Sequence, residues 1–196
     1  MLPSPLTRRR RSKRPDVRQG AREKLLTDAG YPNGHEVTLD CPNKRYADDE
    51  KICQALPAMW AQICVKINVN AMPRATYFPK LEKTDTSMYM LGWGGATTDG
   101  IFIRQPVLST YNGKGDGDYN YGRYSNAKLD DLTAKIKTNM QPEERLGQIH
   151  EALLAHNAEV NHIPLHRQVI PWAERDNITA VHRADNNVIP YWVTIK

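Results

Sequence analysis

Residues 86–99 read Thr-Ser-Met-Tyr-Met-Leu-Gly-Trp-Gly-Gly-Ala-Thr-Thr-Asp, a segment whose strand-like part ends at two glycines. Residues 88–93 alternate between two sets of side chains, the period-two pattern of a strand with one buried face. The pattern stops at Gly94 and Gly95, where the absence of a Cβ lets the backbone turn sharply. A large aromatic residue at a strand end, here Trp93, commonly presents its ring at the mouth of a cleft. The simpler interpretation is a core strand with Trp93 buried.

A strand, a helix and a second strand are predicted before this stretch. Apolar and polar residues alternate over 35–41 and 65–71, and between them apolar residues recur at helical spacing over 52–63. Two such strands joined by a helix form a parallel βαβ unit. Pro57 lies within the helical segment and predicts a kink. Shorter helices are expected over residues 21–30 and 74–83.

The second half of the chain reads as a long loop, two helices and a tail. The loop, residues 94–124, is Gly-rich, and loops of this length are usually functional or mobile. The two helices, about 125–140 and 142–160, are joined by a few residues and should pack as an antiparallel hairpin. A buried strand is expected over 163–172, and shorter strands are expected over 177–181 and near the C-terminus. These elements predict an α/β fold with a mixed sheet and flanking helices.

The positive charge is confined to one end of the chain. The formal net charge is +5, yet eight of the 27 basic residues and one of the 22 acidic residues lie in residues 1–22. The remainder carries 19 basic and 21 acidic residues. Residues 1–20 therefore predict a disordered basic leader, which repels itself and could neutralise nucleic acid or anionic lipid. It has no aromatic residue to stack on bases, so no specific nucleic-acid partner is expected.

The sequence shows no membrane span and no visible export signal. No apolar run reaches the roughly 18 residues that a span requires, and the N-terminus lacks the apolar segment of a secretory signal. Cys41, Cys53 and Cys64 fit no metal or redox motif. Cys41 and Cys64 should lie at opposite ends of the parallel sheet, too far apart for a disulfide. All three are interpreted as small packed thiols.

No cofactor, metal site or catalytic residue is predicted. His162 and His166 have the spacing of a zinc-binding helix, but Pro164 between them prevents that helix. His150 and His156, six residues apart, should point to different faces of their helix. There is no nucleophile elbow and no phosphate-binding glycine loop. A small hydrolytic enzyme whose site assembles in space remains an alternative, as does a nucleic-acid-binding protein that uses the basic arm.

Six ordered landmarks closely resemble the dipeptide- and oligopeptide-binding family of extracytoplasmic solute-binding proteins, which serve bacterial ABC importers. In chain order they are Ala-Arg-Glu-Lys-Leu-Leu-Thr-Asp-Ala-Gly-Tyr-Pro-Asn-Gly (21–34), Val-Thr-Leu (37–39), Val-Lys-Ile-Asn-Val (65–69), Leu-Gly-Trp (91–93), Tyr-Ser-Asn-Ala-Lys-Leu-Asp (124–130) and Ile-Pro-Leu-His (163–166). The resemblance covers about residues 21–196. It implies noncovalent capture of a small solute or short peptide and delivery to a membrane permease, without catalysis, in the periplasm.

The resemblance also implies how the chain is divided. Members of the family have two lobes around a ligand cleft and are longer than this chain. Residues 21–175 resemble the C-terminal ligand-binding lobe of a periplasmic binding protein, and residues 176–196 the tail that returns toward the N-terminal lobe. We expect a truncated product of a transporter gene, with a frame disruption near Gly20 as one route to it. Weak ligand affinity and self-association through an exposed lobe face are expected consequences.

The resemblance places the ligand site around Trp93. In members that bind free peptides, an Asp just after the Gly-Trp pair takes the α-amino group of the ligand; here that place is Ala96, and Asp99 is the nearest acid. Trp93 and the neighbouring backbone are expected to form an apolar wall with exposed amides. A guanidinium binds a carboxylate bidentately, which makes arginines candidates for the other end of a ligand. The predicted ligand-binding residues are Gly92, Trp93, Gly94, Gly95, Asp99, Arg74 and Arg104; for Arg104 the alternative is a solvated loop charge.

Overall fold

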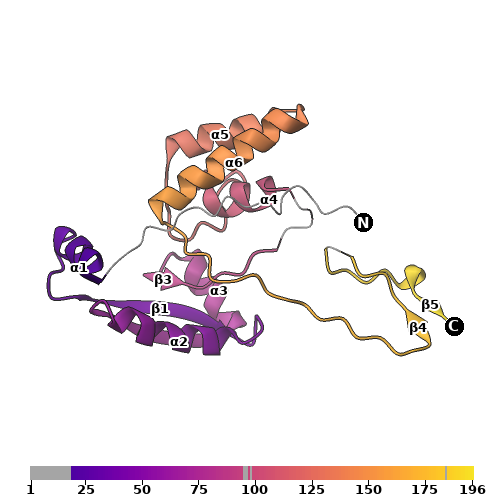
Figure 1. The fold of residues 1–196 in the computed structure, drawn as a ribbon, viewed down its shortest axis with the longest axis horizontal. Coiled ribbons are helices and arrows are strands. Elements are labelled where there is room, and N and C mark those ends of the chain that lie inside the picture. The colour runs from indigo at the N-terminus through magenta and orange to yellow at the C-terminus, as the bar shows by residue number, and fades with distance from the viewer. Residues whose placement is uncertain (1–18, 95–96, 98, 184) are drawn as a thin grey trace. The chain divides into compact units, whose positions relative to one another are not determined.

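The computed structural model describes residues 19–94, 97, 99–183 and 185–196, and it divides the chain into two compact units, Met1–Met90 and Leu91–Lys196 (Figure 1). Residues 1–18 of the leader and the alanine at position 96 lie outside the described residues, so the expectations for them stand as predictions; Gln19 and Gly20, the last two residues of the predicted leader, instead begin the first helix. Within the described part, no helix is both long enough and apolar enough to cross a membrane.

The first unit is a parallel sheet with helices packed against it. The sheet order is β2-β1-β3, and β1 pairs with β2 in a register that begins with His35 opposite Val65. Helix α2 packs against β1 and β2 (Figure 1). The βαβ unit is therefore confirmed. The elements are α1 (Gln19–Asp28), β1 (His35–Asn43), α2 (Asp49–Ala61), β2 (Val65–Pro73), α3 (Arg74–Glu82) and β3 (Met88–Tyr89).

Strand β3 is shorter than the alternation in the sequence predicts. It comprises Met88 and Tyr89, after which one further backbone bond joins the Met90 N–H to the Asp40 carbonyl at 3.1 Å. The buried Tyr77 hydroxyl donates to the Met90 carbonyl at 2.6 Å, which fixes the end of the strand from helix α3. Burial raises the pKa of Tyr77, so the hydroxyl remains a donor. The strand therefore ends next to Met90, whose carbonyl accepts a hydrogen bond from the Tyr77 hydroxyl.

The expectation of three packed thiols is wrong. Cys41 in β1 and Cys53 in α2 form a disulfide, both fully buried, while Cys64 is free and exposed. Cys41 and Cys64 are not paired, as predicted, but α2 packs on β1 and so brings Cys53 over Cys41. Met90 packs against this disulfide, with its Sδ 3.6 Å from the Cys53 Sγ. The core around the disulfide consists of Leu39, Val65 and Ile67, with Leu26, Val37, Leu56, Trp60, Ile63, Val69 and Met88 packed against it.

Removing this disulfide is expected to destabilise the first unit. The bond closes a loop with a sequence separation of 12, so the Cys41→Ser/Cys53→Ser double variant should lose about 2–3 kcal/mol of unfolding free energy. Chemical denaturation followed by circular dichroism measures this loss. The Cys64→Ser variant is the control and should unfold at the same denaturant concentration as the parent. Equal stability of the double variant and the control would show that the disulfide does not form.

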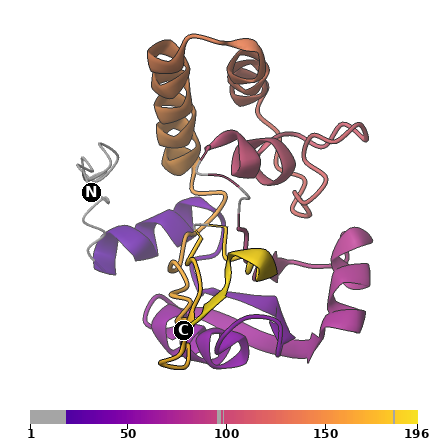
Figure 2. The same ribbon diagram turned by 90° about the vertical axis from the view of Figure 1, so that its right-hand side faces the viewer.

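The second unit contains a short helical segment, a structured loop and a helical hairpin. Its elements are α4 (Ile101–Ile103), the π-helical turn η2 (Arg104–Leu108), α5 (Ala127–Thr138), α6 (Pro142–Glu159), β4 (Ile178–Thr179), the 3-10 turn η3 (Pro190–Trp192) and β5 (Thr194–Ile195). Helices α5 and α6 pack side by side (Figure 2), as predicted, around Leu129, Leu132, Ile136, Ile149 and Ala152. The Asn126 side chain caps α5 by accepting the Leu129 N–H at 3.2 Å.

The loop that the sequence marks as irregular is organised by a fully buried asparagine. The Asn120 side-chain amide donates to the carbonyls of Ser109 and Tyr124, and its oxygen accepts the Tyr124 N–H. One side chain thus joins both ends of the segment between η2 and α5. The residues between them are held in place rather than left free.

The segment after α6 agrees only in part with the prediction. Residues 163–172, expected as a buried strand, form no strand, and their apolar side chains are largely exposed; Val169 is 84% exposed. The predicted strand near 177–181 is present as β4, which pairs antiparallel with β5. Parallel and antiparallel pairing therefore both occur, in two separate sheets. A largely apolar segment resembles a buried strand in sequence even where its side chains stay exposed in the fold.

Candidate ligand-binding site

Trp93 forms one wall of a small apolar cavity in the second unit. Its indole N–H donates to the Phe102 carbonyl at 2.7 Å, and its ring contacts Tyr119 in a tilted arrangement, with centroids 4.8 Å apart and an interplanar angle of 59°. The cavity measures about 220 Å³ and is lined by Trp93, Ile101, Phe102, Gln105 and Pro106. The ring is half-buried, as expected for a surface that receives an apolar group, and differs from the simpler interpretation of a fully buried tryptophan.

The glycines beside Trp93 are only partly described. Gly92 and Gly94 are exposed, and a Cβ on Gly94 would have nothing within 4 Å. Gly95 lies outside the described residues. Among the described residues, Gly94 therefore has space around its Cα.

Asp99 is occupied by partners of its own. Its Oδ1 accepts the Ile101 N–H at 3.0 Å, and its Oδ2 pairs with the Arg145 guanidinium at 2.6 Å. Burial opposes its ionisation, but the hydrogen bonds from Arg145 and Ile101 and the charge of Arg145 outweigh burial, so the pKa of Asp99 is lowered. The carboxylate thus stays charged and ties the start of α4 to α6. A ligand amine would have to compete with Arg145 for it.

Arg104 lies in the interior, and neither interpretation from the sequence describes it. Its side chain is 1% exposed, so it is no solvated loop charge. Its Nη2 donates to the Leu129 carbonyl at 2.6 Å, while Nε and Nη1 have no partner in the described part of the chain. Burial lowers the pKa of this guanidinium. A ligand carboxylate at the surface does not reach this group, because helix α5 and the loop enclose it.

Arg74 is exposed and belongs to the first unit, where it begins α3. Its guanidinium carbon lies 5.9 Å from the centre of the Phe78 ring. Among the predicted cationic residues it is the one with a solvent-accessible charge. Its role toward a ligand remains a proposal.

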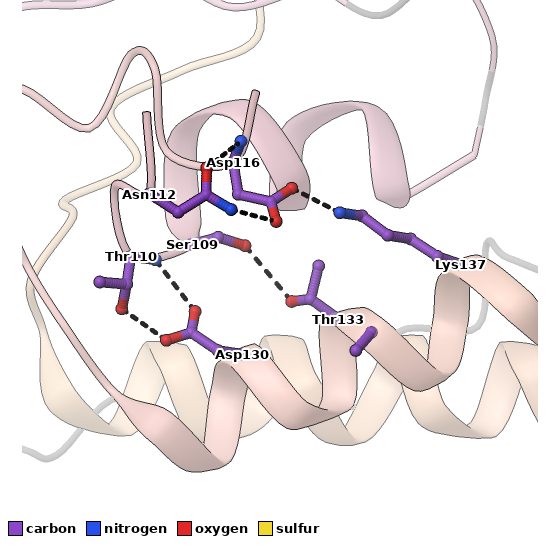
Figure 3. Close-up of a pocket in the computed structure, with 8 residues that line it drawn as sticks. Ser109, Thr110, Asn112, Asp116, Asp130, Thr133 and Lys137 are labelled. Atoms are coloured by element: carbon purple, nitrogen blue, oxygen red, sulfur yellow. Dashed lines mark hydrogen bonds and ion pairs between the residues drawn. The ribbon is translucent and has the colours of Figure 1, made fainter. Parts of the chain in front are cut away.

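A second, polar cavity lies between the 109–116 loop and helix α5 (Figure 3) and was not predicted. It measures about 260 Å³, and most of its lining is hydrogen-bonded within itself. Asp130 accepts the backbone and side chain of Thr110, and Asp116 pairs with Lys137 and accepts from Asn112. The spacing of Asn112 and Asp116 is the one sequence signal that indicates such a loop. These contacts hold the loop on α5, so the cavity has a structural explanation.

The described residues hold no cluster of three or more histidine, cysteine, aspartate or glutamate side chains that could bind a metal ion. The described lining of the cavity beside Trp93 is apolar except for Gln105.

The first unit thus contains a parallel sheet with helices packed against it, and the second contains a helical hairpin and a small aromatic cavity. Residues 13–115 match the family model described as "Bacterial extracellular solute-binding proteins, family 5 Middle". The chain belongs to this family, whose members are non-enzymatic, extracytoplasmic binding proteins that serve ABC transporters.

Curated relatives and solved structures agree with this assignment. Glutathione-binding protein GsiB of Salmonella paratyphi A is 30% identical over 165 residues, which is 81% of this chain and 31% of the relative. GsiB of Escherichia coli K12 is 30% identical over 131 residues, 64% of this chain and 25% of the relative. This chain thus spans about a third or less of the length of the relatives it matches.

Two solved structures show the same fold. HbpA2 from Haemophilus parasuis has a TM-score of 0.66 at 19% identity, covering 93% of this chain and 37% of that one. The periplasmic binding protein DppA from Helicobacter pylori, solved with the peptide STSA, has a TM-score of 0.61 at 22% identity, covering 68% and 26%. At these identities the likeness concerns the fold, and it confirms the predicted α/β lobe.

Proposed function

We propose that this chain provides the ligand-binding lobe of a solute-binding protein that captures a peptide-like solute and delivers it to an ABC permease. The observation that carries the proposal is the half-buried Trp93 beside an apolar cavity, in a chain of this family. Glutathione is the first ligand to test, because the relatives at 30% identity are named for it. The peptide STSA, bound by a solved relative, is the second.

The ligand's apolar part would rest on Trp93 and Phe102, with the exposed Gly94 beside Trp93; Gly92 and Gly95 remain predicted ligand-binding residues. Asp99 would contribute indirectly, by fixing the start of α4, which carries Ile101 and Phe102 into the cavity wall. Arg74, in the first unit, remains a predicted ligand-binding residue. For the 196 residues tested by themselves we expect an affinity of only about 1 mM, because two-lobed binding proteins gain affinity when the lobes close over the ligand.

Truncating Trp93 tests the site. Trp93→Ala removes the ring that forms the wall and should weaken binding of glutathione or STSA at least about tenfold, since an aromatic contact of this size contributes more than about 1.4 kcal/mol. Ligand-observed NMR titration measures the change at this weak affinity. Tyr191→Ala, a control at a side chain 83% exposed, should bind like the parent. Equal binding by both variants would place the ligand elsewhere.

The buried Cys41–Cys53 disulfide supports a periplasmic location, because disulfides persist in oxidising compartments. Residues 176–196 expose several apolar side chains. This supports their proposed role, which is to pack against a further lobe like that of the longer relatives. In isolation this surface would favour self-association. The enzyme and nucleic-acid alternatives have no comparable support.

A further inference from the structure

A buried pair of histidines closes the C-terminal end of α6. His156, in the last turn of the helix, is 3% exposed. Its Nε2 lies 3.0 Å from the Nδ1 of His162, just beyond the helix, and the edge of Tyr124 packs against its ring at a centroid distance of 5.6 Å. This hydrogen bond needs one ring nitrogen as donor and the other as acceptor. It cannot form when both rings carry a proton on each nitrogen.

The turn between the two histidines is strained. Val160 ends α6 with φ 55° and ψ 27°, a left-handed conformation that is unfavourable for a β-branched residue. Such a conformation persists only where surrounding contacts hold it. Here the contacts are the histidine pair and Glu159, whose carboxylate accepts the Tyr124 hydroxyl at 2.5 Å and the Asn126 amide.

The surroundings of the pair disfavour a positive charge. The charged and titratable groups that face His156 are His162 beyond the helix, Tyr124 before α5, Arg104 from η2 and Glu159 from its own turn. Burial, together with His162 and Arg104, lowers the pKa of His156 to about 4, against the opposing effect of Glu159. Burial also lowers the pKa of His162. Both rings are therefore neutral in the closed arrangement at neutral pH.

We propose that His156 and His162 form a proton-operated clasp, which fixes the path of the chain as it leaves α6 and releases it when the surroundings acidify. In the closed state the shared hydrogen bond holds the strained turn at Val160. In the open state both rings reach water and can each take a proton. A fall in pH therefore opens the clasp and makes the segment that follows α6 more mobile.

Linkage gives the size of the effect. In the open state His156 should titrate near its ordinary pKa of about 6.5, whereas in the closed state its pKa is about 4. Because the open state binds more protons, acidification below about pH 6.5 favours it. From His156 alone, the open-to-closed ratio at pH 5 should be about 30-fold higher than at pH 7.5.

Hydrogen exchange of the full chain tests the clasp. Exchange is followed by mass spectrometry at pH 7.5, 6 and 5, with labelling times scaled for the intrinsic pH dependence of exchange. The peptide spanning residues 153–162, which contains the last hydrogen-bonded turn of α6, should lose protection as the pH falls, while peptides within α5 keep theirs. Protection that is independent of pH would overturn the proposal, and so would equal loss throughout α5 and α6, which indicates global unfolding.

Two matched variants separate the clasp from general acid sensitivity. His156→Gln keeps a neutral hydrogen-bonding side chain and removes the titrating group from which the linkage is calculated, so the pH-dependent loss at 153–162 should shrink. His150→Gln, an exposed histidine on the same helix, should retain the full loss. Equal losses in the two variants contradict the clasp. NMR titration of the parent chain needs no variant. Ordinary pKa values near 6.5 for both His156 and His162 would also overturn the proposal.

Discussion

Replacing Gly117 by alanine is expected to destabilise the second unit by about 3 kcal/mol or more, because an added methyl group would overlap the backbone of the 109–111 turn. An ideal Cβ on Gly117 would lie 2.5 Å from the Ser109 carbonyl oxygen and 2.6 Å from the Tyr111 nitrogen. Both are main-chain atoms and cannot move aside as a flexible side chain can.

The turn has little freedom to relax around this methyl group. The Gly117 N–H donates to the Gln105 carbonyl at 2.8 Å, and the buried Asn120 holds the Ser109 carbonyl from the other side. The φ of Gly117 is +68°, which adds the usual cost of a left-handed conformation. Relief of the overlap would therefore break the contacts that place this loop on α5.

Gly113→Ala is the matched control for this prediction. Gly113 has nearly the same φ, +67°, but its added Cβ would have just one neighbour within 4 Å, the Tyr111 hydroxyl at 3.8 Å. It should cost about 1 kcal/mol, the conformational term alone. Chemical denaturation of both variants, followed by circular dichroism, measures the difference. If the two lose the same stability, the turn is not as closely packed as described.

Asp49→Ala is expected to cost the first unit about 3 kcal/mol, because one buried carboxylate satisfies four backbone N–H groups. Asp49 is 3% exposed, and its oxygens accept from Lys44 at 3.1 Å, Arg45 at 2.8 Å, Tyr46 at 2.9 Å and Glu50 at 2.9 Å. Alanine would leave these donors without acceptors where α2 begins. The loop between β1 and α2 would lose the group that shapes it.

The neighbouring Asp48 supplies a control for Asp49→Ala. Its side chain is 63% exposed and forms a surface ion pair with Lys51, so Asp48→Ala should cost less than about 1 kcal/mol. Urea denaturation at pH 7 compares the two variants. Burial opposes ionisation of Asp49, yet the backbone hydrogen bonds outweigh burial and lower its pKa, so its contribution is fully present at pH 7 and fades in acid below about pH 4. Equal losses from the two variants would contradict the role given to Asp49.

Periodicity was sufficient for the elements that bury one face. The alternation in β1 and β2 and the helical spacing in α2, α5 and α6 predicted elements that the structure contains. It failed where an apolar run meets no partner, as in residues 163–172, and where a side chain ends a strand early, as Tyr77 does at β3. Periodicity is local, whereas these outcomes depend on what lies across the fold.

The site was predictable in its aromatic part and less so in its charges. A tryptophan followed by glycines indicated a presented ring, and Trp93 does line a cavity. The burial of Arg104 and the pairing of Asp99 with Arg145 depend on how α4, α5 and α6 meet, which no spacing in the sequence records. The Cys41–Cys53 disulfide likewise required the position of α2 over β1.

The central claim, noncovalent binding of a solute at the Trp93 cavity, is tested most directly by native mass spectrometry of the purified chain. Spectra are recorded alone and with glutathione or STSA at millimolar concentration, with Trp93→Ala alongside. We predict a complex whose mass equals protein plus unmodified ligand, released intact on activation and reduced in Trp93→Ala. A folded protein that forms no such complex, or that releases a chemically altered ligand, would contradict the account.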